Sequence, residues 1–118
     1  MSKKQARLKK QLEHITRTYP NSLRAEVAIE ALDYGDDIEN FFTDLLIHGC
    51  QSGMVSKLVY YSDTHKFYDS HYDEIETLRE ELEDSLGEPL HPKGDLKNWF
   101  AWMAFEETAR TIAEEAGL

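Results

Sequence analysis

A chain of 118 residues, 41% of them hydrophobic, suits a single domain with its own core and excludes the composition of a disordered protein. Its one cysteine excludes an internal disulfide framework, and its longest apolar stretch, residues 99–105, is too short to cross a membrane. The net charge of −10 is unevenly divided, since residues 1–24 hold seven bases against one acid, so we expect electrostatic contact with a partner or between the two halves.

The first third of the chain has apolar residues at helical spacing. A basic amphipathic first helix is predicted over residues 1–19, and its apolar stripe consists of Leu8, Leu12, Ile15 and Tyr19. A proline ends this helix, and Ser22 can cap a second helix over residues 23–32. Asp36 and Glu39 have the spacing of a capping box. They open a third helix whose inward residues are Ile38, Phe41, Phe42, Leu45 and Leu46.

In the second half, residues 54–61 are ambiguous because valine and tyrosine also favour strands, but a helix is preferred since no second strand is available for pairing. Ser62-Asp63-Thr64 is expected to cap a short helical turn. An acidic helix over residues 71–86 follows, with inner residues Tyr72, Ile75, Leu78, Leu82 and Leu86. Beyond a loop, the helix over residues 96–116 is apolar on nearly every side in its first half, which is typical of a buried C-terminal helix. The prediction is an all-α, single-domain bundle of five or six helices.

The predicted helix 71–86 carries seven acids beside a single base, Arg79. Its net charge of about one per 3 Å, at ~1.5 Å of rise per residue, matches the one charge per ~3.4 Å of a DNA strand. This face can be a solvated surface, a docking surface for a basic protein or a metal-loading site. The docking hypothesis assigns partner binding to Asp73, Glu76, Glu80, Glu83, Asp84, Tyr68 and Tyr72. The two tyrosines belong to it because tyrosine is enriched at interface hot spots, although they also fit an ordinary core edge.

The bases of the first helix have two possible roles. They can contact nucleic acid directly, and the binding residues are then Lys3, Lys4, Arg7 and Lys10. They can instead lie against the acidic helix of the same molecule, where exposed pairs contribute about 0–1 kcal/mol each. Membrane binding is not expected, because the apolar stripe contains no Trp or Phe.

Little in the sequence indicates catalysis. His65 and Asp69 are four residues apart and would share one helix face, and both side-chain types are ligands for zinc or manganese. The spacing of zinc-enzyme motifs is absent, so surface polar residues are the simpler interpretation, and no catalytic residue, metal or cofactor is predicted. Cys50 follows a helix end, where the backbone dipole disfavours a thiolate, so we expect a structural turn there.

Three segments, Gly49–Ser56, Tyr60–Thr64 and Gly94–Trp99, resemble small uncharacterised proteins carried by phages and plasmids. The likeness covers roughly residues 36–116 and brings no catalytic residues with it. It implies a mobile-element setting, in which small acidic proteins often inhibit host defence. Anti-CRISPR and anti-restriction proteins are among them, and some imitate DNA.

We therefore expect a non-catalytic, cytoplasmic interaction protein that blocks a basic, nucleic-acid-binding host defence complex through its acidic helix. One alternative is a nucleic-acid-binding accessory protein that works through the basic first helix, and another is a metal-dependent enzyme around His65 and Asp69. The cytoplasmic location follows from the lone cysteine and from the lack of an apolar segment after the charged first residues. The oligomeric state stays open.

Overall fold

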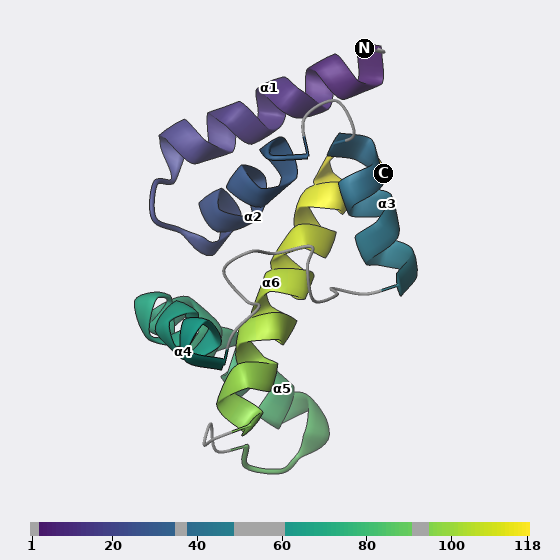
Figure 1. Ribbon diagram of the computed structural model, residues 1–118. Coiled ribbons are helices and arrows are strands. Elements are labelled where there is room, and N and C mark those ends of the chain that lie inside the picture. Colours follow the sequence, from purple (N-terminus) through teal and green to yellow (C-terminus); the bar gives the residue numbers. More distant parts are fainter. Residues whose placement is uncertain (1–2, 35–37, 49–60, 91–94) are drawn as a thin grey trace.

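The computed structural model describes residues 3–34, 38–48, 61–90 and 95–118 (Figure 1). These ranges hold six helices and no strand, which confirms the predicted all-α bundle. The helices are α1 (Lys3–Thr18), α2 (Leu23–Leu32), α3 (Ile38–His48), α4 (Tyr61–Ser70), α5 (Tyr72–Leu86) and α6 (Asp95–Glu115). None of them is long and apolar enough to cross a membrane. The predicted cap at Asp36, the ambiguous residues 54–60 and Cys50 lie outside the described residues.

The C-terminal helix α6 is the axis of the fold. Figure 1 shows α2 and α3 beside its C-terminal half, and α4 and α5 beside its N-terminal half, and all four helices contact it. Its fully buried residues are Phe100, Ala101, Ala104, Phe105, Ala109, Ile112 and Ala113. Trp99, which the apolar first half of the helix led us to expect inside, is 49% exposed. The other helices do not surround α6 completely. One side of its apolar first half, which includes Trp99, therefore faces solvent.

The basic helix α1 packs on α2 and α3 through its apolar stripe. Leu8, Leu12 and Ile15 are buried, whereas Tyr19 is exposed because the helix ends at Thr18. Figure 1 places α1 and α5 at opposite ends of α6. The bases at the start of α1, which border the C-terminal residues, are therefore well separated from the acids of α5 within one molecule.

The start of α2 is capped by Ser22, as its position in the sequence predicts. The Ser22 hydroxyl oxygen accepts a hydrogen bond from the backbone N–H of Ala25 at 3.1 Å, and the hydroxyl donates to the carbonyl of Tyr19 at 2.6 Å. These bonds satisfy one of the free amides at the helix start and fix the turn between α1 and α2.

Removal of this cap by Ser22→Ala is expected to lower the free energy of unfolding by about 1 kcal/mol, measured by urea denaturation. Ser22→Thr is the matched control, because threonine keeps the hydroxyl, and most of the stability should remain. Equal stability of Ser22→Ala and the parent chain would contradict a capping role.

Helix α4 corrects the prediction of a capped short turn. Thr64 lies inside a ten-residue helix, is buried, and donates a hydrogen bond from its hydroxyl to the side-chain oxygen of Asn98 on α6. Phe67 and Tyr68 are buried on the same side. These three residues have the helical spacing of an inner face, so Ser62-Asp63-Thr64 lies within a helix that begins at Tyr61 and does not cap a shorter one.

The inner face of α5 is shorter than predicted. Ile75 is fully buried, and Leu78 and Leu82 are half-buried against the core. Tyr72 and Leu86 were expected on this face, but they are 54% and 57% exposed. They are the first and last residues of α5, so the buried part of its apolar stripe is confined to the middle of the helix.

Candidate acidic interaction site on α5

The acids of α5 fall into two rows along the helix. At about 100° of rotation per residue, Asp73, Glu80 and Asp84 lie within roughly 40° of one another, on the side opposite the buried Ile75. All three are exposed, and we call them the outer acidic stripe. Glu76 and Glu83 form the second row, nearer the core, and both are part-buried.

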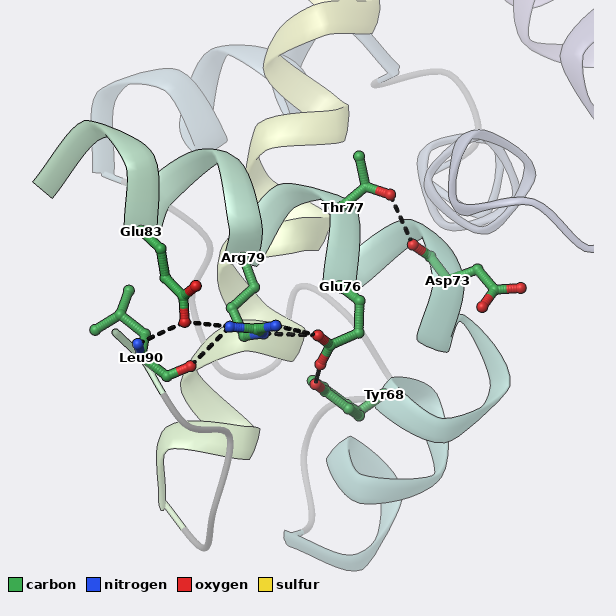
Figure 2. A network of polar contacts seen from close by, with 7 residues as sticks. All are labelled: Tyr68, Asp73, Glu76, Thr77, Arg79, Glu83 and Leu90. Atoms are coloured by element: carbon green, nitrogen blue, oxygen red, sulfur yellow. Dashed lines mark hydrogen bonds and ion pairs between the residues drawn. The ribbon is translucent and has the colours of Figure 1, made fainter. Parts of the chain in front are cut away.

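The second row is held by Arg79, as Figure 2 shows. The Arg79 Nε donates to Glu76 Oε2 at 2.7 Å, and Nη2 of the same guanidinium is 2.6 Å from that oxygen. Nη1 donates to Glu83 and, at 2.9 Å, to the carbonyl oxygen of Leu90. The Leu90 N–H donates to Glu83 Oε1 at 2.6 Å, and the Tyr68 hydroxyl donates to Glu76. This Arg79 network joins α4, α5 and the segment that follows α5.

The charges of Arg79 and Glu76 stabilise each other. The hydrogen bond from Arg79 lowers the pKa of Glu76 below its ordinary value, and the carboxylate in turn raises the pKa of Arg79. Burial, followed by the hydrogen bond to Glu76, raises the pKa of Tyr68. At neutral pH the carboxylate of Glu76 is therefore ionised and the phenol of Tyr68 is protonated, as the hydrogen bond between them requires.

The first turn of α5 is tied to α2. The Leu23 N–H donates to Glu74 Oε2 at 2.9 Å, so this acid serves the start of α2. The buried His71 ring lies 3.6 Å from carboxylate oxygens of both Glu26 and Glu74, with its plane tilted against Phe67. Glu74 is thus engaged within the fold, although its neighbour Asp73 is exposed.

The seven residues proposed for partner binding do not form one surface. Asp73, Glu80 and Asp84 are exposed, and Figure 2 shows the Asp73 carboxylate directed away from the Arg79 network. Glu76 and Glu83 belong to that network, and Tyr68, only 2% exposed, donates into it. Tyr72 is exposed and touches the edge of Tyr68, with 6.0 Å between ring centroids. The structure therefore separates an accessible outer stripe from an inner row with a structural role.

Two exposed residues beside the outer stripe were missed as site residues. Glu81 follows Glu80 on the adjacent side of α5, and Trp99 of α6 faces solvent near it. The charge of Glu81 was enough to predict an exposed position. Trp99 lies in an apolar segment whose pattern predicts burial. Its exposure depends on which side of α6 the other helices cover.

The four bases proposed for nucleic-acid contact, Lys3, Lys4, Arg7 and Lys10, are all exposed on α1. Lys4 pairs with Glu39 of α3 at 3.3 Å. Three of them border an open cavity of about 470 Å³ between α1 and the C-terminal residues, with Leu8 among its apolar lining. Their exposure is compatible with binding phosphates.

The proposed metal ligands His65 and Asp69 share helix α4. Asp69 pairs with Lys97 of α6 at 2.7 Å, and the Lys97 ammonium also lies 5.2 Å from the centroid of the Tyr68 ring. Among the described residues, no group of three His, Cys, Asp or Glu side chains is placed to hold a metal ion. The part of the chain that the structure describes gives a metal site at this pair no further ligand.

Comparison with known proteins returns one family. A family model described as "Domain of unknown function (DUF7222)" matches residues 7–117. No curated protein and no solved structure matches the chain. The family description assigns no activity.

Proposed function

The chain belongs to the DUF7222 family, and we propose that it is a non-catalytic interaction protein that binds a basic, nucleic-acid-binding partner through the outer acidic stripe of α5. One observation carries the proposal. Asp73, Glu80 and Asp84 are exposed in one row, and their carboxylates have no hydrogen bond or ion pair with another described residue, whereas Glu74, Glu76 and Glu83 are engaged within the fold. Within the described part of the chain, no ion pair therefore offsets the charge of the stripe.

The spacing of this charge supports imitation of a nucleic-acid strand. Asp73 and Asp84 are eleven residues apart, or about 16 Å along a helix axis, and with Glu80 and Glu81 they supply about one charge per 4 Å. A DNA strand carries one per ~3.4 Å. The Arg79 network beneath holds α5 against α4 and the segment at Leu90, so a partner would meet a preorganised row of carboxylates.

The partner class rests on the resemblance of this chain to small acidic proteins of phages and plasmids. Inhibition of a host defence complex of the CRISPR or restriction type is the role such proteins often have. A surface that competes with DNA for a basic groove fits that role, because electrostatic complementarity governs both the rate and the specificity of association. The proposed place of action is the cytoplasm, where such complexes meet foreign DNA.

Removal of the stripe by the triple substitution Asp73→Asn, Glu80→Gln and Asp84→Asn is expected to reduce partner capture by about tenfold or more. Tagged protein is incubated with a nuclease-treated prokaryotic lysate that contains CRISPR and restriction systems. Bound nucleic-acid-binding proteins are quantified by mass spectrometry after washes at low and high salt. Helical content, measured by circular dichroism, should not change, because these carboxylates make no hydrogen bond or ion pair with another described residue.

The matched control neutralises three exposed acids elsewhere, with Asp33→Asn, Asp44→Asn and Glu114→Gln. It changes the net charge by the same amount and should capture the same proteins as the parent chain. Equal loss in both triple variants would mean that only overall charge matters, and this would refute the stripe as a binding site.

A second candidate function is direct nucleic-acid binding by α1, and the exposure of Lys3, Lys4, Arg7 and Lys10 at the far end from α5 favours it. The same pull-down separates the two functions. If nucleic acid is recovered before nuclease treatment and no protein after it, α1 is the working surface. A salt-labile protein that survives the nuclease supports the acidic stripe.

A further inference from the structure

Helices α5 and α6 leave an open groove of about 490 Å³ between them. Its apolar lining consists of Leu78 and Leu82 from α5 and of Trp99 and Met103 from α6. Each pair is four residues apart, so each helix contributes two side chains from successive turns of one face. The volume falls within the range of about 300–1,000 Å³ that is usual for binding sites.

The lining is unusual for a surface that only meets water. Trp99 is about half exposed although it packs on Phe100, with 5.1 Å between ring centroids, and Met103 beside it is half-buried. Tryptophan is one of the residue types that are enriched at the energetic centres of protein interfaces. Methionine adapts to irregular partner surfaces because its side chain is unbranched and polarizable.

Acids border this apolar lining. Glu81 on the α5 side and Glu107 on the α6 side are exposed, and Glu106 lies at the same edge, 3.5 Å from Arg110. The groove is thus an apolar channel with a negative rim. Its complement is an apolar face flanked by positive charge, which is the pattern of a basic amphipathic helix.

We propose that this groove binds a basic amphipathic helix of the partner, and the inference rests on the function proposed for the outer acidic stripe. Leucine-like side chains of the bound helix fill the space around Trp99 and Met103. Its lysines and arginines meet Glu81 and Glu107. Because Glu81 adjoins Glu80 in the sequence, the flank of the same helix reaches the stripe.

The chain's own basic helix is not the occupant. In α1 the apolar residues Leu8, Leu12 and Ile15 are buried against α2 and α3, so a second copy has no free apolar face on that helix to offer. We therefore assign the groove to a segment of a different protein whose apolar face is exposed before binding, and a second copy of the chain is an outcome of the test below.

The test uses a synthetic amphipathic helix of leucine and lysine, about 18 residues long, and a scrambled peptide of the same composition. Affinity is measured by titration calorimetry against the full chain. Trp99→Ala is expected to raise the Kd for the amphipathic peptide about tenfold or more, whereas Trp99→Phe recovers most of the affinity. Glu81→Gln with Glu107→Gln should weaken binding at low salt and flatten its salt dependence.

The inference is overturned if the scrambled peptide binds as tightly as the amphipathic one, since charge alone then explains binding. It is also overturned if Trp99→Ala keeps full affinity while circular dichroism shows an intact fold. A dimer of the chain in sedimentation experiments that dissociates on Trp99→Ala would assign the groove to a second copy instead.

The two proposals fail in different ways. If the groove is wrong but the stripe is right, capture of nucleic-acid-binding proteins is lost in the stripe variant and unchanged by Trp99→Ala. If the stripe is wrong but the groove is right, Trp99→Ala loses the peptide, while the stripe variant still captures every protein that the parent chain captures.

Discussion

Arg79→Met is expected to lower the free energy of unfolding by about 2–4 kcal/mol, because it leaves two part-buried carboxylates without their shared cation. Glu76 and Glu83 then face each other across the methionine, and the carbonyl of Leu90 loses its donor. Methionine keeps much of the length and packing of the arginine stem, so the loss reports the guanidinium. The measurement is urea denaturation followed by circular dichroism at neutral pH.

The pH dependence of stability provides the signature of the Arg79 network. The pKa of Glu76 is lowered in the folded state, so its contribution is present above the ordinary value of 4.5 and is lost as pH falls through the folded pKa. The pKa of Tyr68 is raised, so its contribution is full below 10.0 and is lost as pH rises beyond that value. Arg79→Met should therefore flatten the loss of stability on acidification.

The matched control is Arg110→Met, which removes an arginine paired with a glutamate four residues away on a more exposed helix surface. Such surface pairs contribute about 0.3–0.5 kcal/mol. Arg79→Met and Arg110→Met could lower the free energy of unfolding by the same amount, with the same pH dependence. The Arg79 network would then have no structural role, and Glu76 and Glu83 would belong to the same solvated face as the outer acidic stripe.

Phe105→Ala is expected to cost about 3–5 kcal/mol in the free energy of unfolding, the usual range for a buried phenylalanine. Phe105 is fully buried on α6 and faces Phe67 of α4, with 6.4 Å between ring centroids. Its removal leaves a cavity where α4 meets the central helix. A loss of this size is a large share of the stability of a small domain, so the midpoint of thermal unfolding should fall by well over ten degrees, about 4–8 °C per kcal/mol.

Trp99→Ala on the same helix is the comparison for Phe105→Ala. Half of its side chain already faces solvent, so its truncation should cost clearly less stability while it removes the proposed anchor for a partner helix. Equal destabilisation by both substitutions would mean that Trp99 is a core residue. That result would contradict the open groove between α5 and α6.

The helices themselves could be predicted because each depends on local signals. The stripe of Leu8, Leu12 and Ile15, the cap at Ser22 and the dense aromatics of α6 all follow from residues a few positions apart. Local signals do not predict the role of a residue at a contact between helices. Residues 62–64 have the composition of a cap, but Thr64 is buried within α4, where it bonds to Asn98 of α6.

For the site too, properties of a single helix could be predicted, whereas contacts between residues far apart in the sequence could not. The composition of α5 shows that the helix is acidic. It does not show which acids form the outer stripe and which form the inner row. That separation depends on the hydrogen bonds of Arg79 to Glu76, which also binds Tyr68, and to the carbonyl of Leu90, eleven residues after Arg79. Trp99 was assigned to the interior because an all-apolar pattern does not say which side a neighbour leaves open. A groove between two helices has no signature in either helix alone.

The placement of α1 and α5 at opposite ends has a consequence for the way in which this molecule approaches a partner. The structure measures 45 × 28 × 28 Å, and the start of α1, with Lys3, Lys4 and Arg7, lies beside the C-terminal residues at the end of α6 remote from α5. Positive charge at one end and negative charge at the other give a molecule an electric dipole, on which the field of a cationic surface exerts a torque before contact. The torque turns α5 forward and α1 away, which shortens the rotational search and raises the association rate at low ionic strength.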